Sequence, residues 1–216
     1  MPKLTIRLIV ALLAFLLGVA ATMAFLFKSE NRMHQGDVTP VVQERQELRL
    51  IIPDAGWEPI FFKPLNELTT EVNLPKLRTV LLPDNDFEVR VWAVGGGQGE
   101  AHGFMLKRSA GQWATVHLRG MGEPMHVQKY EETLATPISG WERAWERLMS
   151  VGLLTLPDGS EAHCNASVID GVSYIVEINM NKTYRTYMYE NPKAAKCNEA
   201  RQMTQIVEII DKEFGW

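Results

Sequence analysis

An uncharged apolar run, LIVALLAFLLGVAATMAFLF, occupies residues 8–27 and constrains the chain more than any other feature of the sequence. A run of twenty such residues is long enough to cross the hydrocarbon core of a bilayer as one helix. A secretory signal peptide is the alternative, because residues 19–21 (Val-Ala-Ala) resemble a small-residue cleavage site. The apolar residues continue through positions 23–27, beyond a typical signal core. We therefore expect an uncleaved signal anchor.

The charges that flank this run predict its orientation. Lys3 and Arg7 lie on the N-terminal side, whereas Glu30 offsets part of the positive charge of Lys28 and Arg32 on the other side. Positively charged flanks are retained preferentially in the cytoplasm. The flanks therefore favour a cytoplasmic N-terminus and an exported body.

The rest of the chain divides into a linker and one domain. We assign residues 1–27 to a cytoplasmic stub and transmembrane anchor, 28–47 to a polar linker without apolar periodicity, and 48–216 to an exported domain. Beyond residue 27 the chain carries 20 basic and 26 acidic side chains, and no basic cluster. This charge argues against nucleic acid and anionic lipid as partners.

The chain has two cysteines, Cys164 and Cys197. In an exported domain, an even number of cysteines predicts a disulfide. Two buried thiols or a metal-binding pair are the alternatives. We expect the disulfide, with no metal and no cofactor.

Strand signals dominate the first half of the domain. The segments 48–52, 77–82 and 87–94 are predicted strands, and the last alternates between an apolar and a more polar face. The segment 57–75 holds three prolines and is expected to be irregular, with at most a short helix. The glycine-rich GGGQG at 95–99 lacks a following Gly-Lys-Ser/Thr and is interpreted as a hairpin connection, not a phosphate-binding loop.

A hairpin is predicted around residues 109–111 (Ser-Ala-Gly). A three-residue loop at this turn pairs Lys107 with Trp113. That register places His102 and His117 on opposite faces of the sheet, which argues against a site that both histidines share.

Two amphipathic helices complete the expected α+β domain, whose sheet should be mainly antiparallel. Ser139 and Glu142 form a Ser-x-x-Glu capping box ahead of an apolar stripe that includes Trp141 and Trp145, which we interpret as core anchors. A second stripe follows Asn198, a candidate N-cap. Its members are Ala200, Met203, Ile206, Val207, Ile210 and Phe214.

Residues 170–192, DGVSYIVEINMNKTYRTYMYENP, predict a second hairpin with tyrosines at alternate positions. A three-residue loop at 180–182 pairs Glu177 with Arg185. A two-residue loop would instead place Arg185 among apolar side chains, which the cost of burying a guanidinium disfavours. We therefore expect the three-residue loop.

The expected register collects a candidate binding site of Glu177, Arg185, Tyr187 and Tyr189 on one face of the hairpin. Tyrosine and arginine are favoured at contact surfaces, so this face is expected to meet a protein partner. The alternative is that a helix covers the face and the tyrosines pack across the strands.

Three segments resemble sequences that recur in small, uncharacterised, membrane-anchored bacterial envelope proteins: EVRVW at 88–92, DGVSYIVE at 170–177 and YRTYMYENP at 184–192. The resemblance implies a single-pass protein of the bacterial inner membrane, with its C-terminal domain in the periplasm. It carries over no catalytic residues.

Catalytic motifs such as HExxH and GxSxG do not occur in the sequence. His163 and Cys164 are adjacent, and neighbours on a strand point to opposite faces. Asp158, Asp170 and Glu177 are the candidates for a carboxylate pair in space. We therefore expect no catalytic residues.

These features favour a membrane-tethered, non-catalytic envelope domain that binds a protein or another envelope component. A hydrolase acting on envelope material and a structural subunit of a membrane complex are the other two classes considered.

Overall fold

The computed structural model describes residues 47–53, 58–95, 100–121, 126–133, 136–166, 168 and 171–216. The apolar run at residues 8–27 lies outside these ranges, as does the linker apart from its last residue. Within the described ranges, no helix is both long enough and apolar enough to cross a bilayer.

Within the described residues, seven strands form one sheet in the order β1-β7-β6-β2-β3-β4-β5. The neighbours from β7 to β5 are antiparallel, and only the short β1 runs parallel to its neighbour, β7. This confirms the α+β class with a mainly antiparallel sheet. The strands are β1 (Arg49–Ile51), β2 (Phe87–Gly95), β3 (Glu100–Ser109), β4 (Gln112–Met121), β5 (His126–Thr133), β6 (Val172–Met180) and β7 (Thr183–Glu190).

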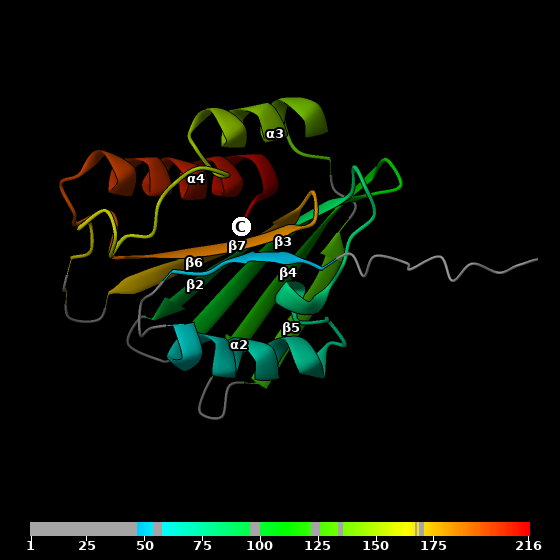
Figure 1. Cartoon of the computed structure of the whole chain (residues 1–216), viewed down its shortest axis with the longest axis horizontal. Helices are drawn as coiled ribbons and strands as arrows, with labels where there is room; N and C mark the ends of the chain where they lie inside the picture. The colour runs from blue at the N-terminus through cyan, green and yellow to red at the C-terminus, as the bar shows by residue number, and fades with distance from the viewer. Residues whose placement is uncertain are drawn as a thin grey trace, which may run out of the picture. The chain divides into compact units, whose positions relative to one another are not determined.

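Helices cover both faces of this sheet. In Figure 1, α2 (Glu58–Glu71) lies on one face, and α3 (Trp141–Ser150) and α4 (Asn198–Phe214) lie on the other. The two predicted amphipathic helices are α3 and α4. The sheet is therefore the middle of three layers, with an apolar cluster on each side.

We expected the segment 57–75 to be irregular, with at most a short helix. It instead contains the 14-residue helix α2. Pro59 lies in the first turn, where a backbone N–H has no intrahelical acceptor in any case. Phe62 and Leu65 are buried against the sheet. Burial of this face outweighs the cost of Pro64 in the helix interior.

The predicted strand at 77–82 is also wrong. Its first residues form a 3-10 helix, η1 (Leu77–Thr79). The backbone carbonyls of Leu77 and Val80 accept hydrogen bonds from Nδ2 of Asn179, at 3.0 and 2.7 Å. A side chain of β6 thus bonds carbonyl groups that a neighbouring strand would otherwise satisfy.

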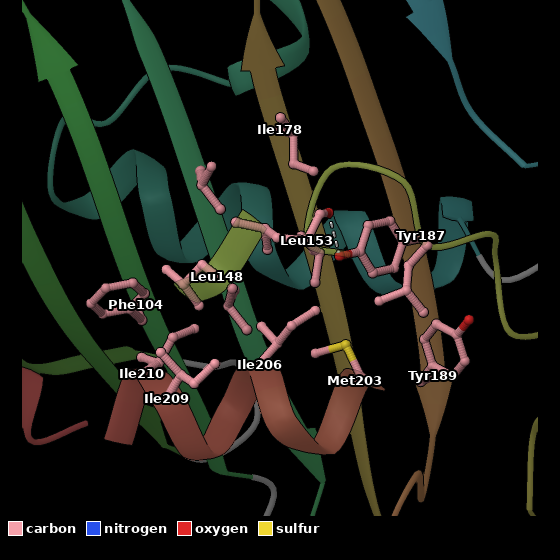
Figure 2. Packing of buried hydrophobic residues seen from close by; sticks show 14 of the residues in the cluster. Phe104, Leu148, Leu153, Ile178, Tyr187, Tyr189, Met203, Ile206, Ile209 and Ile210 are labelled. Atoms are coloured by element: carbon pink, nitrogen blue, oxygen red, sulfur yellow. Dashed lines mark hydrogen bonds between the residues drawn. The ribbon is translucent and has the colours of Figure 1, made fainter. Parts of the chain in front are cut away.

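The alternation predicted for residues 87–94 is confirmed in β2. Phe87, Val89 and Val91 belong to the apolar cluster beneath α3 and α4, whereas Trp92 belongs to the cluster beneath α2. Figure 2 shows the first cluster between α4 and the sheet. The segment 95–99 connects β2 to its antiparallel neighbour β3, as a hairpin connection does, although residues 96–99 lie outside the described ranges.

The predicted caps of α3 and α4 are not the observed ones. Gly140 is the N-cap of α3, and the backbone N–H of Ser139 donates to Oε2 of Glu213 at 2.8 Å. Glu142 accepts from the indole of Trp113 at 3.3 Å instead of closing a capping box. At α4 the N-cap is Cys197, one residue before the predicted Asn198.

The tryptophans of α3 are core anchors, as interpreted. Trp145 stacks on Phe87 with ring centroids 4.4 Å apart, and Trp141 stacks on Trp113 at 5.8 Å. The stripe predicted for α4 also faces the core: Ala200, Met203, Ile206 and Ile210 are buried. Both amphipathic patterns therefore identify the packed faces correctly.

Both hairpins use two-residue turns where we expected three-residue loops. The turn residues Ala110 and Gly111 have φ of 49° and 79°, and Asn181 and Lys182 have φ of 50° and 58°. Two consecutive positive φ values are typical of the type I′ turn, whose twist matches that of the flanking strands. A one-residue shift in register moves every side chain of one strand to the other face.

In the first hairpin, this shift pairs Arg108 with Trp113 and Lys107 with Ala114. His102 is opposite Arg119, and His117 is opposite Phe104. The two histidines therefore share a face, and the prediction that they point to opposite faces is wrong.

Candidate functional site

The predicted binding face of the second hairpin does not form. The observed register pairs Glu177 with Thr186, Ile178 with Arg185 and Val176 with Tyr187. Arg185, Tyr187 and Tyr189 thus lie on the face covered by α3 and α4, and Glu177 lies on the face covered by α2. Tyr187 and Tyr189 are each 0 % exposed, so neither tyrosine is available to a partner.

Backbone carbonyls after α3 explain how the half-buried Arg185 is accommodated on this face. Its guanidinium donates to the carbonyl oxygens of Leu154 and Leu156. It also lies 5.2 Å from the ring centroid of Tyr187, within the range of a cation–π contact. The charge that made the two-residue loop unfavourable in our prediction is therefore hydrogen-bonded and stacked.

The tyrosine hydroxyls bind the same segment. Tyr187 donates to the carbonyl of Leu153 at 2.8 Å, and Tyr189 donates to that of Pro157 at 2.9 Å. Burial raises the pKa of both phenols above its ordinary value. Together with Arg185, the two tyrosines hold residues 153–157 against β7 through hydrogen bonds.

The carboxylate of Asp158 has a structural part in this arrangement. It accepts hydrogen bonds from the backbone N–H groups of Met188 and Ser160, at 2.8 and 2.9 Å. Gly159 N–H donates in turn to the carbonyl of Met188 at 2.9 Å. The segment therefore covers part of the outer edge of β7.

Glu177 is buried in the layer beneath α2, and its two oxygens accept separate hydrogen bonds. Trp92 Nε1 donates to Oε2 at 2.8 Å, and the hydroxyl of Tyr184 donates to Oε1 at 2.9 Å. Arg90 lies directly opposite on β2. Burial raises the pKa of Glu177, and the positive charge of Arg90 and the two hydrogen bonds only partly oppose this rise.

The three candidate carboxylates do not form a described catalytic pair. Asp158 binds backbone groups at the edge of β7, Glu177 binds Trp92 and Tyr184 within the α2 layer, and Asp170 lies outside the described ranges. Asp158 and Glu177 therefore each have a structural role through these hydrogen bonds.

The raised pKa of Glu177 predicts a specific pH dependence of stability. Below its ordinary pKa of 4.5, Glu177 is protonated in both the folded and the unfolded chain, and its contribution to stability is fully present. Between pH 4.5 and the folded-state pKa, Glu177 ionises in the unfolded chain but stays protonated in the folded one. Its contribution to stability is therefore lost at up to about 1.4 kcal/mol per pH unit as the pH rises.

Denaturant unfolding of the wild type and Glu177→Gln across this pH range measures the effect. We expect the stability of the wild type relative to Glu177→Gln to fall as the pH rises. A difference between the two proteins that does not change with pH would contradict the assignment.

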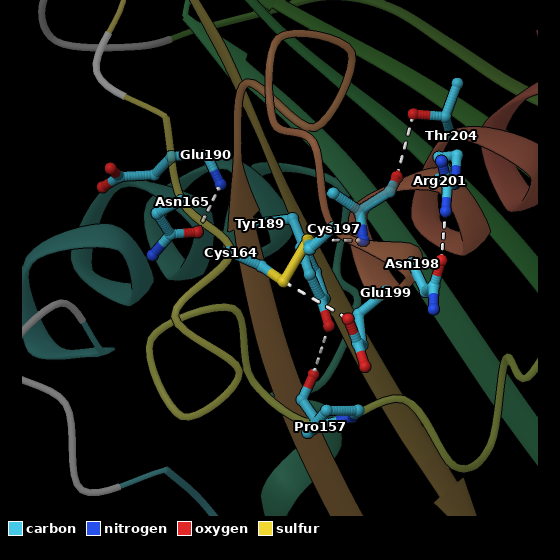
Figure 3. Close-up of a disulfide and its surroundings, with 11 residues drawn as sticks. Pro157, Cys164, Asn165, Tyr189, Glu190, Cys197, Asn198, Glu199, Arg201 and Thr204 are labelled. Carbon is cyan, nitrogen blue, oxygen red and sulfur yellow. Dashed lines mark hydrogen bonds between the residues drawn. A yellow bond between two sulfur atoms is a disulfide. The ribbon is translucent and has the colours of Figure 1, made fainter.

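The predicted pairing of Cys164 and Cys197 is confirmed. Their sulfur atoms are 2.11 Å apart, and the disulfide connects the segment before β6 to the N-terminus of α4 (Figure 3). Oε2 of Glu199 lies 3.4 Å from Sγ of Cys164. Bonded sulfurs carry no thiol proton and are not thiolate ligands, so the metal-binding alternative for these residues does not apply to the disulfide form.

A surface groove of about 650 Å³ runs along α2. Most of the side chains that line it are polar and exposed, among them Lys63, Glu67 and Lys76. Solvated charges of both signs are typical of an ordinary helix surface, and the groove is the weaker candidate site despite its size.

The stronger candidate is a cleft of about 350 Å³ beneath the C-terminal half of α4, which we name the α4 cleft. Ala93 of β2 forms its floor, in a row across three strands between His102 of β3 and Tyr174 of β6. The small side chain of Ala93 leaves space between two larger neighbours. The lining residues are Ala93, His102, Tyr174, Lys193, Val207, Glu208, Asp211 and Trp216.

Aromatic rings and charges are combined in the α4 cleft. The rings of Tyr174 and Trp216 meet edge to face, with centroids 6.5 Å apart, and burial raises the pKa of Tyr174. Nε1 of Trp216 is buried and has no acceptor among the described residues. Glu208 and Asp211 supply two carboxylates and Lys193 one ammonium group, all three exposed.

Sequence reasoning did not identify this cleft. Its members come from three strands, one helix, the turn before that helix and the last residue of the chain. The spacing of Glu208 and Asp211 on one side of α4 was the available signal, because residues three apart in a helix are neighbours.

No protein-family profile matches the chain, and a search of curated proteins returns no significant relative.

Proposed function

We propose that this chain is a membrane-tethered, non-catalytic envelope domain that binds a protein partner through the α4 cleft. The observation that carries the proposal is the composition of the cleft. It combines two aromatic walls, a small residue on the floor and a few charged groups at the rim. Pockets that bind ligands are concave and largely apolar, with few polar groups that fix orientation.

The same proposal places the anchor at residues 8–27, in a bacterial inner membrane, with the domain in the periplasm. The length of the apolar run and the charges of Lys3 and Arg7 support this orientation. The pairing of Cys164 with Cys197 is compatible with an oxidising compartment.

Recovery of crosslinked partners from native membranes tests the function. The full-length tagged chain is compared with Ala93→Leu, which fills the floor of the cleft, and with Gln205→Leu, a control that adds a leucine at an exposed position of α4 outside the cleft. We expect Ala93→Leu to lose at least about 80 % of the recovered partner, corresponding to a loss of roughly 1 kcal/mol or more. Gln205→Leu should retain it.

Thermal unfolding of each variant shows whether the fold is intact. If Ala93→Leu is unstable, Ala93→Val replaces it, because valine adds less volume at the same position of the floor and leaves the charge of the rim unchanged. Equal recovery of a partner by the wild type and a folded cleft variant would refute the proposed function and favour a structural role for the domain.

A further inference from the structure

We infer that the α4 cleft binds a basic side chain, arginine or lysine, of the protein partner. This inference rests on the proposed function and specifies the chemistry of the ligand. It follows from three features of the cleft: its aromatic walls, the sign of its rim charges and its size.

The aromatic walls favour a cation. Tyr174 and Trp216 both line the cleft, and their rings lie close enough to contact a single group. In Figure 1 the C-terminus, where Trp216 lies, is between α4 and the sheet. Tryptophan and tyrosine faces attract a guanidinium or ammonium group within about 6 Å of the ring centroid.

The rim charges also favour a cation. Glu208 and Asp211 lie on α4 at the cleft, and Lys193 is the one ammonium group among the described residues that line it. The rim therefore carries a net negative charge. Carboxylates form charge-assisted hydrogen bonds with arginine and lysine, and with arginine these can be bidentate.

The volume agrees with a single side chain as the occupant. At about 350 Å³, the cleft is near the lower end of the range for small-molecule pockets, about 300–1,000 Å³. A protein partner that inserts one long side chain would use the cleft as the pocket for an anchor residue, a common arrangement in interfaces.

Substitution of Lys193 tests the sign of the charge on the ligand. If the ligand is a cation, the ammonium group of Lys193 opposes binding, and the carboxylate of Asp211 favours it. The two exposed groups should each change affinity by about two- to fivefold, because solvent screens them. An anionic ligand would reverse both effects.

The probe is Nα-acetyl-arginine methylamide, compared with its neutral citrulline analogue and with Nα-acetyl-glutamate methylamide. Binding to the full-length chain is followed through the indole ¹⁵N–¹H resonance of Trp216, assigned with Trp216→Phe. We expect the arginine probe to bind about tenfold more tightly than the citrulline probe. Lys193→Gln should strengthen binding of the arginine probe, and Asp211→Asn should weaken it.

Glu146→Gln is the matched control, because Glu146 is an exposed carboxylate of α3 outside the cleft lining. It should leave the affinity unchanged. Equal binding of arginine and citrulline, tighter binding of glutamate, or no binding of the arginine probe would each overturn the inference. The proposed function fails separately, through unchanged partner recovery by Ala93→Leu, so the two failures are distinguishable.

Discussion

Replacement of Tyr187 by alanine is expected to lower the free energy of unfolding by about 3–5 kcal/mol, the range for truncating a large buried aromatic side chain. Tyr187 is 0 % exposed and packs in the cluster beneath α4 (Figure 2). Its ring meets that of Tyr189 edge to face, with centroids 6.2 Å apart. The variant would also leave the guanidinium of Arg185 without its aromatic contact.

Tyr187→Phe separates the contribution of the ring from that of the hydroxyl. It keeps the packing but leaves the carbonyl of Leu153 without its donor, which should cost about 1–3 kcal/mol. Urea unfolding of both variants measures the two effects. A Tyr187→Ala variant as stable as the wild type would mean that the side chain is exposed, and would restore the binding face first expected from the sequence.

The register of this hairpin shows where reasoning from the sequence reached its limit. The alternation of residues 170–192 predicted two strands, and the strands are present. The choice between registers depended on the cost of burying Arg185. That cost is offset by the carbonyls of Leu154 and Leu156, and nothing in the local sequence indicates that this distant segment lies beside β7.

Elements whose stability depends on local pattern could be predicted. The alternation in β2 separates the residues that meet the two apolar clusters, and the apolar stripe of α4 identifies the buried face of that helix. Helix α2 could not be predicted, because Pro64 in its interior opposes a helix and only burial of Phe62 and Leu65 against the sheet compensates for it. The errors are thus concentrated where contacts distant in sequence outweigh local preference.

The α4 cleft also depends on contacts between residues that are distant in sequence. Its floor requires the registers of β3, β2 and β6 at the same time, because Ala93 matters only when His102 and Tyr174 lie on either side of it. The predicted register of the first hairpin, one residue away from the observed one, leaves β3 facing correctly but reverses β4. No described residue of β4 lines the cleft, so this error did not hide it; the sequence lacked the pairing of β2 with β3 and with β6.

Removal of the disulfide is expected to lower the free energy of unfolding by about 3–4 kcal/mol in the chain-entropy model, for two cysteines separated by 33 residues. The double variant Cys164→Ala with Cys197→Ser is the appropriate one. Sγ of Cys197 accepts a hydrogen bond from the backbone N–H of Ala200 at 3.3 Å as the N-cap of α4. Serine keeps a capping oxygen there, so the variant reports mainly on the crosslink.

Three further measurements decide whether the crosslink is responsible for this loss. Thiol labelling of the unreduced, denatured wild type should find neither Cys164 nor Cys197 reactive, and reduction of the wild type should reproduce most of the destabilisation. The segment at 158–166 also bonds the edge of β7, through Asp158 and Asn165. Its amide protons should therefore exchange faster in the double variant, since the disulfide holds one end of this segment to α4. Quantitative labelling of both cysteines, or a double variant as stable as the oxidised wild type, would show that the pair does not stabilise the domain.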